Sequence, residues 1–176
     1  MRVLIDTNVL ISAALSADGT PYQAYVKAAS YPNHGLICEQ NVDEMKRIFN
    51  KKFPNRLGAL DKFLSVALLT LELVPVPTEE DMTETQIRDV NDRPILRAAI
   101  EAKADVLLTG DKDFLESGVK NPAIMTPAEF LNTYLTQGQR AESEKLPARC
   151  AYICCISFLS IRVILSLMVS VLVLLK

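Results

Sequence analysis

Short apolar runs separated by longer amphipathic segments fill the first 136 residues of the chain. The runs are three or four residues long and rich in valine, leucine and isoleucine, as buried strands of a parallel sheet are. They lie at 3–5, 36–38, 73–76, 106–109 and 123–125. Their alternation with helical patterns predicts a parallel sheet flanked by helices, which is the α/β class.

The segments between these runs repeat apolar residues at steps of three and four, the period of an amphipathic helix. Pro21, Pro94 and Pro127 mark the first turns of three such helices, because proline is tolerated at that position. The predicted helices span 9–15, 20–30, 42–50, 57–71, 94–102 and 127–135. The polar, acidic segment 78–92 is expected to be a loop with one helical turn.

Composition changes sharply after residue 136, which predicts a domain over 1–136 followed by a separate tail. Residues 137–149 are polar and are expected to be a linker, whereas 150–176 form an apolar run long enough to cross a bilayer as a C-terminal hydrophobic helix. Arg162 opposes insertion, while the basic linker residues lie on the domain side, as expected for a cytosolic domain. Two interpretations stay open: a transmembrane anchor, or an extension that is not native to the domain.

Charge and cysteine content narrow the function classes. The chain of 176 residues has a net charge of -2, so no overall basic field indicates a nucleic-acid binder. Residues 1–137 nevertheless hold 14 Lys and Arg against 19 Asp and Glu, a net of -5, and such an excess suits a carboxylate cluster that a metal offsets. Only Cys38 of the four cysteines lies in the predicted domain, and His34 is the only histidine, so neither a disulfide framework nor a zinc site is expected. The N-terminus lacks a signal-peptide pattern, which predicts a cytoplasmic domain.

Four acidic residues lie where predicted strands end or helices begin. Asp6 follows the first strand and Asp111 the fourth, Asp92 precedes a helix, and Glu44 is placed in the first turn of the helix after the second strand. Functional groups of a parallel α/β sheet gather beyond the carboxyl ends of its strands. The four acids are therefore expected to converge on one edge of the sheet.

Each acid also has a purely structural interpretation. Asp6 could cap a helix, Asp92 could favour the dipole of the helix that follows, and Asp111 with Asp113 could be turn residues. Glu44 could form a capping box with the residue three positions earlier.

A divalent cation would resolve the repulsion among converging carboxylates, which otherwise raises their pKa values. Ligands that are all oxygen favour Mg²⁺ or Mn²⁺ over zinc. Such an ion suits phosphodiester cleavage, since it polarises the phosphoryl oxygen and lowers the pKa of the attacking water.

Three stretches, LIDTNVLISA, DVNDRPILRAAIEAKADVLLTGDKDFL and IMTPAEFL, resemble the PIN-domain ribonucleases, most closely the VapC-like toxins of toxin–antitoxin pairs. The resemblance covers about residues 1–136. It implies a PIN-like, Rossmann-like α/β/α sandwich with a central parallel sheet and an endoribonuclease site that depends on Mg²⁺ or Mn²⁺.

The resemblance also assigns roles to residues. The family's catalytic, metal-binding acids map onto Asp6, Glu44, Asp92 and Asp111, with Asp113 as a further ligand. Glu39 and Asp43 lie close to Glu44 and are alternatives for this mapping. A helical wheel favours Glu44 over Asp43, because it places Glu44 beside the apolar face and Asp43 away from it.

Two polar residues, Asn8 and Thr109, look like the family's supporting shell, which orients Asp6 and the waters of the metal. Arg93 stands where many relatives have asparagine or another small polar residue, which predicts an altered substrate contact. RNA contacts are expected from nearby cations, whose alternative is an ordinary solvated surface. These cations are Arg93, Lys112, Arg47, Lys51 and Lys52.

The leading hypothesis is thus a metal-dependent endoribonuclease, the toxin of a toxin–antitoxin pair, with RNA as substrate, a cognate antitoxin as partner and homodimerisation as the family implies. The alternatives are a catalytically silent PIN-like module that binds RNA or protein, and a DNA nuclease on the same scaffold. The expected location is cytoplasmic, with a membrane tether if residues 150–176 insert.

Overall fold

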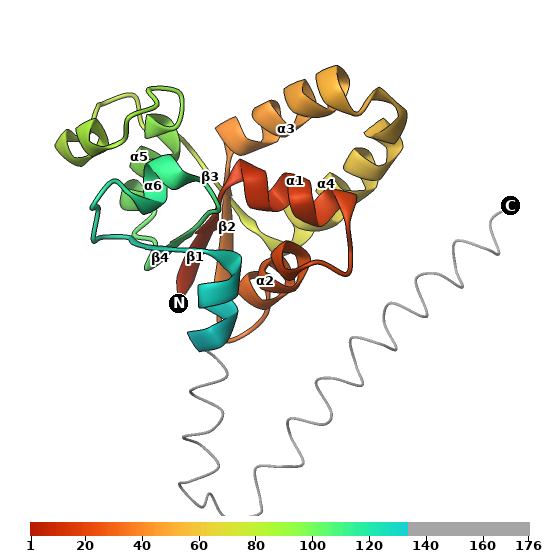
Figure 1. Cartoon of the computed structure of the whole chain (residues 1–176), viewed down its shortest axis with the longest axis horizontal. Helices are drawn as coiled ribbons and strands as arrows, with labels where there is room; N and C mark the ends of the chain where they lie inside the picture. The colour runs from red at the N-terminus through yellow and green to blue at the C-terminus, as the bar shows by residue number, and fades with distance from the viewer. Residues whose placement is uncertain (134–176) are drawn as a thin grey trace, which may run out of the picture. The chain divides into compact units, whose positions relative to one another are not determined.

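The computed structural model describes residues 1–133. A five-stranded sheet lies at its centre, with the order β3-β2-β1-β4-β5 and every neighbouring pair parallel (Figure 1). The strands are β1 (Arg2–Ile5), β2 (His34–Cys38), β3 (Glu72–Val74), β4 (Val106–Leu108) and β5 (Ala123–Met125). All five predicted strands are confirmed. β3 ends two residues earlier than predicted, because Pro75 has no N–H to extend the ladder.

Helices cover both faces of this sheet. They are α1 (Thr7–Leu15), α2 (Thr20–Ala29), α3 (Glu39–Lys52), α4 (Leu57–Thr70), α5 (Arg93–Glu101) and α6 (Lys112–Leu115), with 3-10 turns η1 (Pro54–Arg56) and η2 (Met82–Gln86). Residues 127–133 are also helical. Thr126 and Glu129 cap this helix reciprocally, with backbone N–H donors at 2.8 Å from Glu129 Oε2 and 3.2 Å from Thr126 Oγ1, as a capping box requires.

Alternation of side chains along β1 builds two cores. Val3 and Ile5 pack on the side of α1, α2, α3 and α4, whereas Leu4 packs on the side of α5 (Figure 1). All three side chains are fully buried. The molecule is therefore an α/β/α sandwich, which confirms the expected fold class.

Helix α3 begins three residues earlier than predicted. Cys38 is its N-cap, and the Cys38 backbone N–H donates to Asn41 Oδ1 at 3.0 Å. The suggested capping box between Asn41 and Glu44 is therefore wrong, since Asn41 already occupies the third helical position. Glu44 consequently lies in the second turn of α3, not the first.

None of the helices in residues 1–133 combines the length and the apolar character that crossing a membrane requires. The predicted linker at 137–149, the hydrophobic tail at 150–176 and the expected domain end at residue 136 lie outside the described residues.

Candidate functional site

The neighbouring strands β1 and β4 bring Asp6 and Thr109 together at their carboxyl ends. The Asp6 backbone N–H donates to the Leu108 carbonyl oxygen at 2.9 Å, and Thr109 Oγ1 donates to Asp6 Oδ2 at 2.6 Å. Asp6 Oδ1 accepts from the Thr7 backbone N–H at 2.6 Å, so Asp6 also caps α1. The structural interpretation of Asp6 as a helix cap is thus confirmed, and it is compatible with a role at a site.

A single hydroxyl group connects Asp6 with two other predicted site residues. Thr109 Oγ1 accepts from the Asp111 backbone N–H at 2.9 Å and from Asn8 Nδ2 at 3.3 Å. Asn8 Oδ1 in turn accepts from the Gly110 backbone N–H at 3.2 Å. Thr109 therefore contacts Asp6 directly, and Asn8 acts through Thr109 and the turn that carries Asp111.

Glu44 reaches the same edge of the sheet from α3. Thr7 Oγ1 donates to Glu44 Oε2 at 2.8 Å and accepts from Asn41 Nδ2 at 2.9 Å. Glu44 is largely buried while Asp43 is exposed, as the helical wheel predicted. The sequence reasoning missed Thr7 and Asn41. Their one visible signal was position, because Thr7 directly follows Asp6 and Asn41 lies three residues before Glu44.

Asp92 lies just before α5, on the loop facing α3. Gln40 Nε2 donates to the Asn91 carbonyl oxygen at 2.6 Å and so ties this loop to the start of α3. Asp92 is the N-cap of α5, but its side chain makes no capping hydrogen bond to the residues that the structure describes. The carboxylate is therefore not held by a capping hydrogen bond of α5.

The predicted acids also interact through their charges. The pKa of Asp6 is raised to about 6, mainly by burial and also by the charges of Glu44 and Asp111, while the hydrogen bonds from Thr109 and Thr7 lower it. Burial likewise raises the pKa of Asp92 to about 7, with added repulsion from Asp6, Asp89, Asp111 and Glu44. Acids from four separate segments thus share one electrostatic environment.

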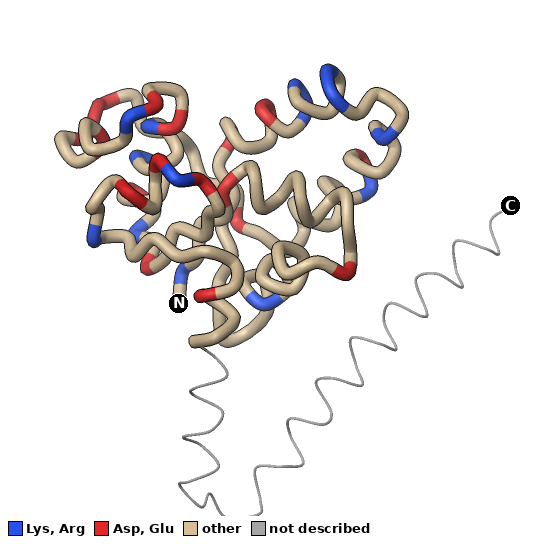
Figure 2. Tube along the Cα trace, viewed as in Figure 1, with Lys and Arg blue, Asp and Glu red and all other residues tan. Residues whose placement is uncertain are grey.

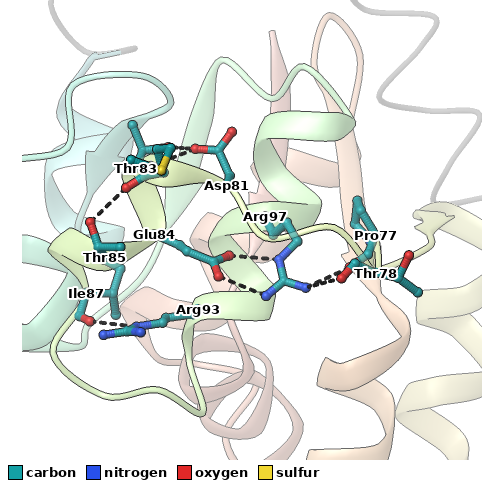
Figure 3. Close-up of polar contacts among 10 residues, drawn as sticks. Pro77, Thr78, Asp81, Thr83, Glu84, Thr85, Ile87, Arg93 and Arg97 are labelled. Atoms are coloured by element: carbon teal, nitrogen blue, oxygen red, sulfur yellow. Dashed lines mark hydrogen bonds and ion pairs between the residues drawn. The ribbon is translucent and has the colours of Figure 1, made fainter.

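A buried ion pair fixes the segment that leads into Asp92. The Arg97 guanidinium of α5 donates to both oxygens of Glu84, at 2.7 and 3.0 Å, and its third nitrogen donates to the Pro77 carbonyl oxygen at 2.9 Å (Figure 3). Arg97 holds the pKa of Glu84 below its usual range. Arg93 Nε donates to the Ile87 carbonyl oxygen at 3.1 Å, which closes the loop against α5 (Figure 3).

The remaining predicted residues lie around this edge with different partners. Asp113 forms an ion pair with Arg88. Arg88 is not among the residues predicted from the sequence. The Asp113 backbone N–H donates to Asp111 Oδ1 at 2.8 Å, so both residues belong to the turn that starts α6. Arg47 pairs with Glu44 at 3.4 Å.

Lys51 and Lys52 are exposed in the last turn of α3, and Lys112 is exposed at the start of α6. Figure 2 shows basic residues along α3 and α4 and acidic residues near the carboxyl ends of the strands.

The donor set fits a hard divalent cation in chemistry, because every candidate ligand is a carboxylate oxygen. As the side chains lie, however, no three acidic, histidine or cysteine residues within residues 1–133 form a group that could hold one ion. Asp6, Glu44 and Asp111 each accept a hydrogen bond from a separate donor. Binding of one ion by three of these residues therefore requires side-chain rotation.

Comparison with known proteins gives a consistent result. A family model of the PIN domain matches residues 2–113. The uncharacterized protein MJ1680 of Methanocaldococcus jannaschii is 26% identical over 148 residues, which cover 76% of this chain and 92% of the relative.

Two solved structures share the fold. One is VapBC2 from Rickettsia felis bound to a DNA fragment from its promoter, with a TM-score of 0.55, 22% identity and coverage of 72% of this chain and 98% of that chain. The other is PAE2754 from Pyrobaculum aerophilum, with a TM-score of 0.50, 17% identity and coverage of 77% and 99%.

Proposed function

The chain belongs to the PIN domain family, whose members are generally nucleases, and from this premise we propose that it is a metal-dependent endoribonuclease. One observation carries the proposal: the hydrogen bonds of Thr7 and Thr109 hold Asp6, Glu44 and the turn of Asp111 together at one edge of the sheet. Repulsion from these three acids also raises the pKa of Asp92. Acids crowded in this way repel one another, and a divalent cation removes that repulsion.

Asp6, Glu44, Asp92 and Asp111 would hold Mg²⁺ or Mn²⁺, with Asp113 as a further ligand once it leaves Arg88. When bound, the ion would polarise a phosphoryl oxygen and lower the pKa of the attacking water. The protein's own part is to fix the acids. Thr109 and the Thr7 backbone hold the Asp6 carboxylate, and the Thr7 hydroxyl orients Glu44.

We also propose that the protein acts as the toxin of a toxin–antitoxin pair and binds a cognate antitoxin. The support is the shared fold with VapBC2 from Rickettsia felis, which was solved with DNA from its promoter. Co-expression with the product of a neighbouring small gene, followed by co-purification, tests this part separately from catalysis.

Cleavage of single-stranded RNA by the full chain tests the proposed activity. We expect cleavage with Mg²⁺ or Mn²⁺, none with EDTA, and weaker cleavage of DNA. Asp6→Asn should reduce the cleavage rate by at least about 100-fold. Substitution of a residue that only hydrogen-bonds to a metal ligand typically costs less. Asp61→Asn on the exposed surface of α4 is the matched control and should cleave like the wild type.

Calorimetric titration with Mn²⁺ separates this proposal from a catalytically silent module. Binding that Asp6→Asn weakens and Asp61→Asn leaves intact supports the metal site. RNA binding without metal binding or turnover would instead identify a silent module, and faster cleavage of DNA would identify a DNA nuclease.

A further inference from the structure

A hollow of about 520 Å³ opens directly beside the carboxylates. Its walls come from α1, the start of α2, the turn between β4 and α6, and Pro127. Asn8 and Asp111 line it and also belong to the hydrogen-bonded group around Asp6. Its volume lies in the range of sites that bind small molecules. The hollow is therefore continuous with the proposed catalytic site.

We propose that this hollow receives one nucleotide of a single-stranded RNA, next to the phosphate on which the carboxylates act. The inference rests on the proposed function and adds a substrate subsite to it. Pro21 and Pro127 offer apolar surface to a base, and Ser12 offers a hydroxyl group to the sugar. An unpaired strand presents its bases to such a hollow directly, whereas a base in a duplex must first be flipped out of the stack at a cost in free energy.

Lys112 supplies the charge that a phosphate needs at the rim of the hollow. It is exposed and follows Asp111 directly, and it forms no ion pair with any residue between 1 and 133. Arg47 and Arg88, in contrast, already pair with Glu44 and Asp113. Lys112 is thus available to a phosphate without breaking a contact.

A second hollow, of about 280 Å³, borders Glu44 and Arg47. One hollow therefore borders the carboxylates at Asp111 and another at Glu44. An RNA strand that extends past the site in both directions needs space on both of these sides. Of these two hollows, the larger is lined by proline and the smaller is not, which is why we assign the base to the larger one.

Substitution of Ser12 tests the subsite, with Ser65 as a matched control. Both serines are exposed on helices, and each hydroxyl donates to the carbonyl oxygen four residues earlier, at 2.8 and 2.7 Å. Ser12→Phe fills the hollow, whereas Ser65→Phe adds the same bulk on α4. The measurement is the Kd of a fluorescein-labelled single-stranded RNA of mixed sequence, by anisotropy, in the full chain carrying Asp6→Asn to prevent cleavage.

We expect Ser12→Phe to raise this Kd roughly tenfold, the scale of losing one base contact, and Ser65→Phe to leave it unchanged. Ser12→Glu, which adds a negative charge with less bulk, should weaken binding as well and covers the case in which the Phe variant does not fold. Equal Kd values for the Ser12 and Ser65 variants would overturn the subsite.

The result is separable from that of the proposed activity. RNA cleavage by the wild type with unchanged binding in the Ser12 variants would remove the subsite alone. Loss of binding in those variants without any metal-dependent cleavage by the wild type would keep the RNA subsite and remove the proposed chemistry.

Discussion

Asp6 gives the folded protein a pH dependence of known sign. Its pKa rises from 3.8 to about 6 on folding, mainly because the carboxylate is buried. Between these values the folded state binds a proton more tightly than the unfolded chain, so the free energy of unfolding falls as the pH rises. We expect the metal-free wild type to lose about 2–3 kcal/mol more than Asp6→Asn between pH 4 and pH 7.

Urea denaturation in EDTA at several pH values measures this difference. Asp61→Asn on α4 should follow the wild type. Parallel pH profiles for wild type and Asp6→Asn would show that Asp6 is not the group responsible.

Thr7 is the residue that connects Glu44 to the rest of the site. Thr7→Val removes the hydroxyl that accepts from Asn41 Nδ2, and Asn41 is fully buried. We expect a loss of about 1–3 kcal/mol in the free energy of unfolding, because the amide is left without an acceptor. Thr7→Ser keeps the hydroxyl and should lose less.

Mn²⁺ affinity, measured by calorimetry, distinguishes orientation of Glu44 from stability alone. Weaker binding by Thr7→Val than by Thr7→Ser is the expected order. The same affinity in both variants would mean that Thr7 contributes to folding without orienting Glu44.

The proximity of the acids, and of Asn8 and Thr109, was predictable from the sequence, whereas the contacts of Thr7 and Asn41 were not. Asp6 and Asp111 follow apolar strands, and that pattern is local. Thr7 and Asn41 are in contact because α1 packs against α3, and no local sequence pattern encodes that contact. Asn41 lies three residues before Glu44, but its side chain bonds to Cys38 at the start of α3 and forms no capping box with Glu44. The ion pair of Asp113 with Arg88, 25 positions away, is another contact that no local pattern encodes.

At the scale of elements, β2 passes α2 closely at Gly35. A Cβ placed there would lie 2.5 Å from Leu71 Cδ2, 3.2 Å from the Ala28 carbonyl oxygen and 3.3 Å from Ala29 Cα. Leu71 can turn aside only in part, because it is buried, and the backbone of α2 must also yield. We expect Gly35→Ala to cost about 1–3 kcal/mol in urea denaturation.

Gly58 is the matched control for that substitution. It lies in the first turn of α4, where an added Cβ meets nothing within 4 Å. Gly58→Ala should stabilise the protein by less than about 1 kcal/mol, since alanine favours the helix. Equal effects of the two substitutions would contradict the close packing inferred at Gly35.

The ion pair between Arg97 and Glu84 fastens the long segment before α5. The two side chains are only 14% and 3% exposed. Arg97→Met leaves a buried carboxylate without its partner, which we expect to cost about 3–5 kcal/mol in urea denaturation. The pair of Glu44 with Arg47, whose side chain is 74% exposed, is the comparison, and Arg47→Met should cost less than about 1 kcal/mol. A small loss in both would show that water reaches Glu84 in the folded protein.

The strands and the longer helices were predictable from the sequence, whereas the shortest helix was not. The strands and the longer helices follow from apolar spacing alone. Helix α6 spans only Lys112–Leu115, too few residues to show a period, and it depends on the Asp111 cap. The early start of α3 depends on the capping box of Cys38 and Asn41, a pair that the usual cap preferences do not favour.

For the described part of the chain as a whole, charge is distributed unevenly. Residues 46–56, in the second half of α3 and in η1, hold five basic residues and no acidic one, whereas residues 79–84, which lead into η2, hold four acidic residues and no basic one (Figure 2). The net charge of the sequence does not reveal this separation, since only the fold places the two groups apart. A nucleic-acid backbone that approaches the carboxylates is therefore attracted along α3 and repelled at η2.

The salt dependence of RNA binding tests whether Lys51 and Lys52 follow the RNA backbone. Each phosphate contact on a single strand adds about 0.7 to the slope of log affinity against log salt. In the Asp6→Asn background, the double variant Lys51→Ala/Lys52→Ala should therefore lower that slope by about 1.4, with each single variant giving about half. Lys120→Ala, at an exposed position before β5, is the control and should leave the slope unchanged. If the double variant also keeps the wild-type slope, the RNA does not follow the end of α3, and the basic surface of α3 and α4 serves another purpose.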